Sequence, residues 1–252
     1  MILNNSVIKM IIKSLIESSY NLSQDLQPLS KILLKEGFID YIYNPLIYAW
    51  EPHKAFIELG GNKGAKTILL GMNPGPHGMG QMGIPFAATT IVKDFLKIKN
   101  LPVLQPEKVH PKRIIKGLDW HKEEISGTRL WSALFDNYGT VDKIFSKIFV
   151  VNHCPLMFFK GDNGTNITPD KIPGETIKKI IRRCDVYLKE IVDIMQIETV
   201  VGVGKYSKKR AEIALGKTKV NLKSCWHPSP ASPLANKNKG ADWRENFRSV
   251  LP

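Results

Sequence analysis

The sequence has few cysteines and no long apolar run. Its 252 residues include three cysteines, Cys154, Cys184 and Cys225, which lie far apart and form no C-x-x-C pair. Three thiolates cannot complete a four-cysteine zinc or iron–sulfur site, and isolated thiols fit a reducing compartment. No stretch approaches the roughly 20 apolar residues that a membrane span requires. We therefore expect no metal site, no cofactor-binding cluster and no membrane association.

The first 20 residues lack the features of a secretory signal. The stretch MILNNSVIKMIIKSLIESSY has apolar residues at helical spacing, but Lys9 and Lys13 interrupt them, and no small-residue cleavage site follows. The pattern predicts an amphipathic helix. We expect a cytoplasmic protein, or a nuclear one in a eukaryote.

Acidic residues are fewer than basic ones. The chain has 23 Asp and Glu against 36 Lys and Arg, which gives a formal net charge of +13 and a pI near 9.6. Such an excess favours a polyanionic partner, nucleic acid first and an anionic membrane second. A lysine-rich, solvated surface without such a partner is the alternative interpretation.

Four short runs predict the strands of a parallel sheet. They are residues 66–71, 147–152, 199–204 and, more weakly, 219–226. Amphipathic helical patterns follow the first three at 129–139, 175–195 and 208–216. Strands that alternate with helices predict an α/β fold, with helices on both faces of the sheet.

The remaining segments suggest no division of the chain. Residues 98–127 are polar, basic and proline-bearing and are interpreted as a long surface segment, and residues 161–166 as a turn. No internal repeat or linker is present. A single domain over residues 1–252 is the expectation, with residues 1–30 as an N-terminal helical segment.

Polar side chains follow three of the predicted strands. Asn73, Asn152 and His227 each lie at or just beyond a strand end, and ligands of parallel sheets bind beyond the carboxyl ends of the strands. In the loop after the first strand, prolines flank Gly75, so a planar group can approach the backbone closely. An amide and an imidazole that are fixed in position by such loops predict a site for a planar, hydrogen-bonding substrate.

Several separate motifs carry a family resemblance. They are GMNPGPHGMGQMGIPF (71–86), HPKR (110–113), ISGTRLW (125–131), VNHCPLMF (151–158), NITP (166–169), VVGVG (200–204), HPSPASP (227–233) and ANK (235–237). From about residue 30 to its C-terminus the chain resembles the uracil-DNA glycosylase superfamily, most closely the single-strand-selective monofunctional (SMUG) branch. The resemblance implies a three-layer α/β/α sandwich around a four-stranded parallel sheet.

The resemblance also implies the catalytic residues. Asn73 matches an asparagine that orients a water, since an amide is no general base. His227 matches a histidine that donates a hydrogen bond to the departing base as negative charge develops on it. A turn asparagine and a surface histidine are the commoner fates of such residues outside these motifs.

The resemblance implies a further set of residues that bind the flipped base. Asn152 matches the residue whose fixed carboxamide reads uracil and rejects cytosine, and Phe86 the ring on which the base stacks. A strand-ending amide and a core phenylalanine are the alternative interpretations. Gly75 and Met79 match positions near the base C5, where a glycine leaves room for a substituent such as hydroxymethyl. The other implied pocket positions are Gly71, Met72 and Met79.

The loop after the last strand is expected to meet DNA. Ser229 matches a phosphate contact, and Lys237 and Lys239 add positive charge. The chain departs from the family at His77, where an aromatic residue is usual, and at Ala231, where the usual wedging arginine is absent. Leu234 is therefore the hypothetical wedge, since apolar side chains can insert between bases.

Together these features predict a monofunctional DNA glycosylase. It would hydrolyse uracil, and 5-hydroxymethyluracil, from single-stranded DNA, with double-stranded DNA as a further substrate, and would act as a monomer without metal or cofactor. No lysine lies in the catalytic motifs, so lyase chemistry is not expected. Alternatives left open are a glycosylase for another deaminated base such as xanthine and a non-catalytic nucleic-acid-binding module. An enzyme of free nucleotides is disfavoured, because no GxxxxGK[ST] or GxGxxG motif is present.

Overall fold

A four-stranded parallel sheet forms the centre of the molecule. In the computed structural model, which describes residues 5–252, its strands are β2 (Thr67–Gly71), β3 (Ile148–Asn152), β6 (Thr199–Val203) and β7 (Asn221–Cys225). They pair in the order β3-β2-β6-β7, all parallel. β2 and β3 are buried on both faces, which explains their unbroken apolar sequences. All four predicted strands are confirmed.

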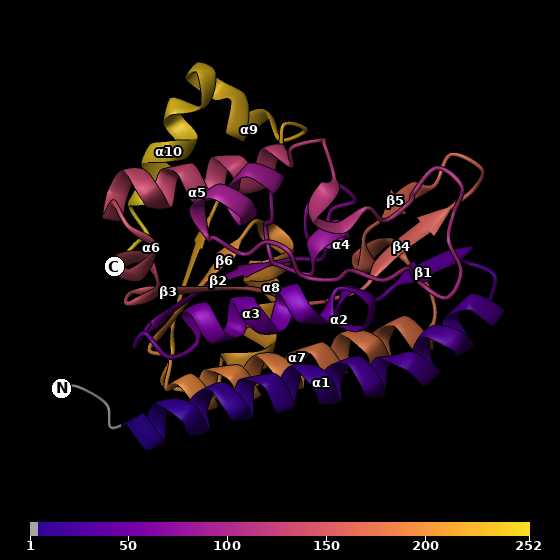
Figure 1. Cartoon of the computed structure of the whole chain (residues 1–252), viewed down its shortest axis with the longest axis horizontal. Coiled ribbons are helices and arrows are strands. Elements are labelled where there is room, and N and C mark those ends of the chain that lie inside the picture. Colours follow the sequence, from indigo (N-terminus) through magenta and orange to yellow (C-terminus); the bar gives the residue numbers. More distant parts are fainter. Residues whose placement is uncertain (1–4) are drawn as a thin grey trace.

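Helices flank this sheet on both sides. Figure 1 shows α1 and α7 side by side below the strands, and α5 and α10 above them. The longer helices are α1 (Asn5–Lys35), α3 (Trp50–Gly60), α5 (Ile125–Tyr138), α7 (Glu175–Met195), α8 (Lys205–Leu215) and α10 (Ala241–Arg248). The shorter ones are α2 (Pro45–Tyr48), α4 (Met79–Met82), α6 (Val141–Phe145) and α9 (Pro233–Asn236). The predicted α/β architecture is confirmed.

The N-terminal helix is longer than its sequence pattern suggested. α1 extends to Lys35 and contains Pro28, whereas residues 1–4 of the predicted helix lie outside the described residues. Its fully buried Leu22 and Leu26 belong to the main core, and the hydroxyls of Ser19 and Tyr187 lie 2.8 Å apart between α1 and α7. Burial of each leucine is worth about 2 kcal/mol, so packing on α7 stabilises this helix.

A second, antiparallel sheet was not predicted. Its strands are β1 (Tyr41–Tyr43), β4 (Met157–Lys160) and β5 (Thr165–Ile167), in the order β1-β4-β5. The predicted turn at 161–166 is therefore only partly right, because Thr165 and Asn166 already belong to β5. These strands of three or four residues are too short to show a period in the sequence.

The predicted surface segment 98–127 is also only partly exposed. His110 and Ile115 are buried, and the His110 backbone N–H donates to the Tyr43 hydroxyl at 2.7 Å. The Gln81 side chain donates to the carbonyl of Ile114 and accepts from the amide of Lys116, at 3.1 and 2.8 Å. Side-chain hydrogen bonds thus attach this segment to the second sheet and to α4.

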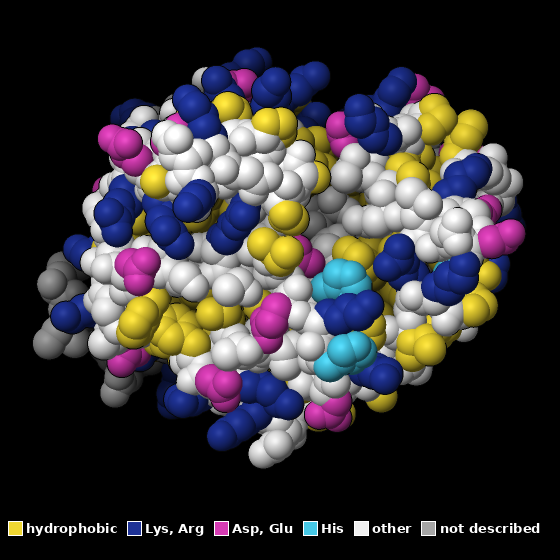
Figure 2. Space-filling model, turned by 90° about the horizontal axis from the view of Figure 1, so that it is seen from above, with side chains coloured by type: hydrophobic (Ala, Val, Ile, Leu, Met, Phe, Trp, Pro, Cys, Tyr) yellow, Lys and Arg dark blue, Asp and Glu magenta, His cyan; other side chains and the backbone are white. Residues whose placement is uncertain are grey.

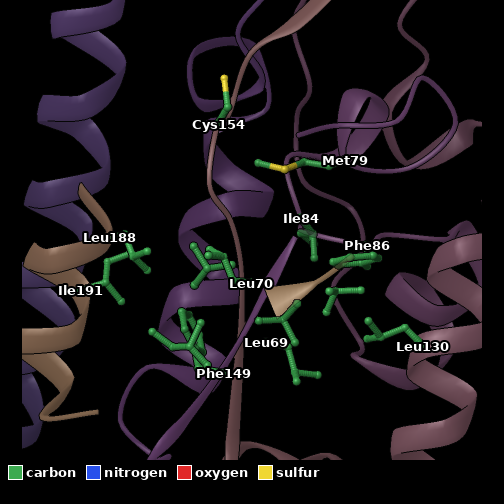
Figure 3. Close-up of a cluster of buried hydrophobic side chains, with 14 of the residues drawn as sticks. Leu69, Leu70, Met79, Ile84, Phe86, Leu130, Phe149, Cys154, Leu188 and Ile191 are labelled. Carbon is green, nitrogen blue, oxygen red and sulfur yellow. The ribbon is translucent and has the colours of Figure 1, made fainter. Parts of the chain in front are cut away.

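The main core continues up to the strand ends. Figure 3 shows Met79, Ile84 and Phe86 in the same cluster as Leu69 and Leu70 of β2. The stretch from Met79 to Phe86 is therefore part of the packed interior, whereas Met72, Asn73 and residues 75–77 are half-buried.

Candidate active site

A pocket of about 400 Å³ opens at the carboxyl ends of the parallel strands. Gly75 and seven side chains that were predicted to form the site line this pocket. The seven are Met72, Asn73, Met79, Phe86, Asn152, His227 and Ser229. Its volume is within the usual range for a small-molecule site. The topology therefore brings the predicted residues together, although they are separated by up to about 150 positions in the chain.

Asn73 follows β2 and is held by one hydrogen bond. Its side-chain Nδ2 donates to the backbone carbonyl of Leu156 at 3.3 Å. This contact directs the amino group toward the protein and leaves Oδ1 as an acceptor in the pocket. An acceptor with no ionisable proton can orient a water but cannot take its proton.

His227 follows β7 and has a defined tautomer. Its Nδ1 accepts the backbone N–H of Ser229 at 3.1 Å, so the proton of the neutral ring is on Nε2. Burial lowers the pKa of His227 to about 4, which keeps the ring neutral at physiological pH. At the end of β6, Gly204 has φ +89°, and a Cβ there would lie 3.1 Å from that of His227. A glycine thus allows the imidazole to pack closely across the neighbouring strand end.

The floor of the pocket is made by Phe86 and the end of β3. The Phe86 and His227 rings lie 6.1 Å apart at an interplanar angle of 37°. Phe86 is 8% exposed and has φ +52°, an uncommon value for a bulky residue. It is both a core residue and a pocket residue, so the two interpretations of its sequence position are compatible.

The carboxamide of Asn152 is confined on both sides. Its Nδ2 donates to the sulfur of Met79 at 3.1 Å. A Cβ at Gly71 would lie 2.1 Å from the Asn152 Oδ1 and 2.6 Å from Phe86. Gly71 therefore lies directly behind the pocket, where any side chain would displace both the amide and the aromatic ring.

The opposite side of the pocket was not predicted. It is formed by Glu124 and Ser126 at the start of α5, and by Asn166 and Thr168 from β5 and the residues after it. The Asn166 Oδ1 is buried and has no hydrogen-bond partner among residues 5–252. The ISGTRLW and NITP motifs were recognised as family sequence, but nothing in them indicated that these side chains face the strand ends.

Glu124 occupies the space above Gly75. A Cβ at Gly75 would lie 2.7 Å from the Glu124 Oε2, so the predicted room at this glycine is bounded by a carboxylate. Burial raises the pKa of Glu124, while Ser126 and the backbone amide of His77, which lie against the carboxylate, oppose that rise. The pocket therefore contains an acidic group in addition to the three amides of Asn73, Asn152 and Asn166 and the imidazole of His227.

The loop after His227 is secured from α5. Arg129 donates from Nη1 to the carbonyl of Pro228 at 3.0 Å and from Nη2 to the side chain of Asn236 at 3.0 Å. The Ser229 Oγ accepts the Ala231 amide at 3.2 Å. Sequence reasoning did not identify Arg129, because a single helical arginine carries no signal of its distant partners.

Three residues expected to contact DNA lie outside the pocket. Leu234 on α9 is 45% exposed, Lys239 is exposed, and Lys237 forms an ion pair with Asp242 at 3.4 Å. Figure 2, viewed from the side where α9 and α10 lie in Figure 1, shows Lys and Arg side chains spread around a central hollow, with His side chains near its edge. The excess positive charge is therefore present on this face of the molecule.

His77, the first departure from the family pattern, stacks on Trp120. The two rings are 5.5 Å apart and nearly parallel, at 12°. Burial and the nearby cations Lys122 and Arg113 lower the pKa of His77. The imidazole thus keeps the packing role of an aromatic ring beside the pocket.

Comparison with known proteins agrees with this geometry. Residues 60–251 match the sequence model of the family described as the uracil DNA glycosylase superfamily. The chain belongs to this superfamily. It is 38% identical over 214 residues to the single-strand selective monofunctional uracil DNA glycosylase of Mus musculus, covering 84% of this chain and 76% of the mouse protein. The enzyme of the same name from Bos taurus is 36% identical over 214 residues, 84% of this chain and 78% of the bovine protein.

A solved structure shares the fold of this superfamily member. The crystal structure of wild-type Pedobacter heparinus SMUG2 aligns with a TM-score of 0.59 at 18% identity, over 83% of this chain and 86% of that one. The α1 helix precedes the residues that match the family.

Possible metal ligands do not form a cluster in the described part of the chain. Among residues 5–252, no three His, Cys, Asp or Glu side chains come together as a metal site, and no helix is long and apolar enough to cross a membrane. All three cysteines are buried and form no disulfide. Burial raises the pKa of Cys225 to about 12, which keeps it a thiol.

Proposed function

We propose that this protein removes uracil from DNA by hydrolysing the bond between the base and the deoxyribose, leaving an abasic site. The main observation in support of this function is that Asn73 and the Nε2–H of a neutral His227 line the same pocket, whose floor is the ring of Phe86. The names of the relatives support this activity. DNA is accordingly the proposed partner, with single-stranded DNA as the preferred form and a monomer as the acting species.

The reaction begins with a base that has been rotated out of the stack onto Phe86. As the bond between C1′ and N1 breaks, its electron pair stays with the base and positive charge develops on the sugar. The Nε2–H of His227 donates to O2 of the base, where negative charge accumulates. A prearranged donor of this kind stabilises the transition state, since it needs no reorganisation during the reaction.

Water completes the hydrolysis at the sugar. The Asn73 Oδ1 accepts a hydrogen bond from a water and aims its oxygen at C1′. The oxygen forms the new bond to C1′, its proton passes to solvent, and the base anion is protonated as it leaves. No lysine is among the described residues that line the pocket, and a Schiff base with the sugar is not part of the proposal.

Asn152 supplies the base selection in this proposal. A fixed carboxamide offers one donor for O4 and one acceptor for N3–H of uracil. Cytosine presents the opposite pattern, with a donor at C4 and an acceptor at N3, so an amide that cannot rotate rejects it. Confinement of the amide between Met79 and Gly71 supports this role.

The test uses purified protein and end-labelled oligonucleotides that each contain one uracil, cytosine, xanthine or hypoxanthine, single- and double-stranded. Treatment with hot alkali reveals abasic sites, and Asn73→Ala is assayed in parallel. We expect alkali-dependent cleavage at uracil, strongly reduced in the variant, and no adduct trapped by borohydride. Binding without cleavage at every base would instead favour the non-catalytic module, and cleavage chiefly at xanthine would reassign the substrate.

A further inference from the structure

A buried network of polar side chains that the proposed hydrolysis does not use lies at the end of β3. The ring of His153 is fully buried, and its Nε2 lies 2.9 Å from the Asp185 Oδ1 on α7. The same carboxylate forms an ion pair with Arg210 on α8, where the distance from Nε to Oδ1 is 3.0 Å. The hydroxyl of Tyr206, also on α8, lies 3.1 Å from the His153 Nδ1. The network therefore joins the strand end to two helices.

The charges in this network fix the direction of its hydrogen bonds. Burial alone would raise the pKa of Asp185, but the hydrogen bonds from His153 and Arg210 hold that pKa below its ordinary value. Burial lowers the pKa of His153, although Asp185 opposes this effect, so the ring is neutral at physiological pH. The Nε2–H of His153 therefore donates to the carboxylate, and its Nδ1 accepts the hydroxyl of Tyr206. Rotation of the ring would break both bonds.

Stability alone does not account for such a network. A buried ion pair loses much of its attraction to the cost of removing both charges from water, and apolar side chains of similar volume often stabilise a protein as well. Directional hydrogen bonds differ from apolar contacts because they fix one relative position of the elements that they join. The network is therefore suited to holding the end of β3 in a defined place.

The strand end that this network holds carries the amide proposed to read the base. Asn152 directly precedes His153, and successive side chains of a strand point to opposite faces. Asn152 therefore faces the pocket, whereas His153 faces α7 and α8. The backbone amides of His153 and Cys154 donate to the carbonyls of Gly71 and Met72, at 3.0 and 2.9 Å. These bonds continue the pairing of β3 with β2 beyond Asn152.

The Asn152 carboxamide has only a weak hydrogen bond of its own. Its Nδ2 donates to the sulfur of Met79, and a thioether is a poor acceptor. Its Oδ1 lies so close to Gly71 that a Cβ there would be 2.1 Å away. A small shift of the backbone at the end of β3 would therefore redirect both the donor and the acceptor of this amide.

We propose that His153 is a positioning residue, whose contacts with Asp185 and Tyr206 hold the end of β3 so that the pocket presents a fixed amide to the base. This inference rests on the proposed function, since it assumes that Asn152 reads uracil. Supporting side chains of this kind determine how precisely a binding group is placed, and a displacement of about 1 Å can cost about 10²-fold in rate.

The experiment compares two substitutions of His153. His153→Phe removes both hydrogen bonds of the ring at similar volume, whereas His153→Gln keeps an N–H donor for Asp185. Single-turnover excision of uracil from a single strand is measured with protein in excess, well below the unfolding midpoint of each variant. We expect a loss of about tenfold in His153→Phe and a rate within about threefold of the wild type in His153→Gln. Inhibition by free uracil should weaken by a similar factor in His153→Phe.

Three further variants distinguish positioning from general stabilisation. His110→Phe replaces another buried histidine, and it should lower the unfolding midpoint but leave the rate within about twofold. When Asn152→Ala is already present, His153→Phe should have almost no further effect on the rate, because the amide that it positions is absent. If His153→Phe does not fold, Tyr206→Phe removes a single hydroxyl and should weaken inhibition by free uracil by about threefold.

The outcomes separate this proposal from the proposed function. A wild-type rate in folded His153→Phe would overturn the positioning role, as would an equal loss when Asn152→Ala is already present, or unchanged inhibition in Tyr206→Phe. In each of these cases uracil hydrolysis would stand. A wild-type protein inactive on uracil and on every other base would contradict the proposed hydrolysis itself and this inference with it.

Discussion

The two walls of the pocket hold their polar groups in different ways. On one wall, Asn73, Asn152 and His227 project from the ends of strands β2, β3 and β7, and the paired backbone of the sheet fixes their spacing. On the other wall, Glu124 and Asn166 come from a helix start and from a three-residue strand. The comparison indicates that the sheet positions the groups proposed for hydrolysis and for reading uracil, whereas a helix start and a short strand position the groups opposite them.

The largest loss is expected from the wall at the strand ends. His227→Ala removes the imidazole N–H that lines the pocket, and loss of one such donor costs about 10²–10³-fold in rate. Single-turnover excision of uracil measures it. The matched control is His121→Ala, an exposed histidine outside the pocket, and a similar loss there would refute the assigned role of His227.

The opposite wall should respond less. Asn166→Ala removes a buried carbonyl oxygen that has no partner in residues 5–252 and that a bound nucleotide can satisfy. A loss of up to about tenfold is expected, mainly in KM, because the group binds and does not react. Asn163→Ala, in the exposed turn before β5, is the control. A loss as large as that of His227→Ala would remove the distinction between the walls.

Leu234 tests whether the wedge lies outside both walls. If this exposed side chain enters the base stack, Leu234→Ala should slow excision from duplex DNA by a few fold and leave single strands unaffected, because only the duplex must be unstacked. Ile213→Ala, another exposed apolar residue, is the comparison on α8. Equal rates on duplex DNA for the wild type and Leu234→Ala would exclude the wedge role.

A smaller effect, on DNA binding, is expected from the lysines outside the pocket. Lys239→Ala should weaken DNA binding modestly and lower the slope of log affinity against log salt by about one, if the lysine contacts one phosphate. Titrations of a fluorescent single strand at several salt concentrations measure this slope. Lys217→Ala, an exposed lysine after α8, is the control, and an equal change in both variants would argue for general charge alone.

The smallest effect concerns pH. Since burial holds the pKa of His227 near 4, its ring is neutral above that value and gains a proton only as the pH falls through it. The single-turnover rate should therefore show no inflection near pH 6.5, where an exposed histidine titrates. A rate that falls as the pH rises through about 6.5, and that no longer does so in His227→Gln, would show that the charged imidazole is the active form.

The residues of the wall at the strand ends could be predicted from the sequence, whereas those of the opposite wall could not. Apolar runs identified β2, β3 and β6, and the residue at each strand end followed directly from the topology of parallel sheets. Glu124 faces Gly75 only because α5 starts beside the loop after β2, which is a tertiary contact across about 50 positions. Three-residue strands such as β5 likewise owe their conformation to pairing and not to local pattern.

Arg129 gives α5 a role beyond packing. The same helix begins next to Glu124 in the base pocket and, one turn later, fastens the loop that follows His227. A shift of this helix along its axis would therefore change the fit of the base and the shape of the DNA-facing loop in a single movement. Substitutions on the buried side of α5, such as at Trp131, would change both properties together although these residues do not line the pocket. Natural variation along this helix would therefore alter the activity of the enzyme without replacing its reactive groups.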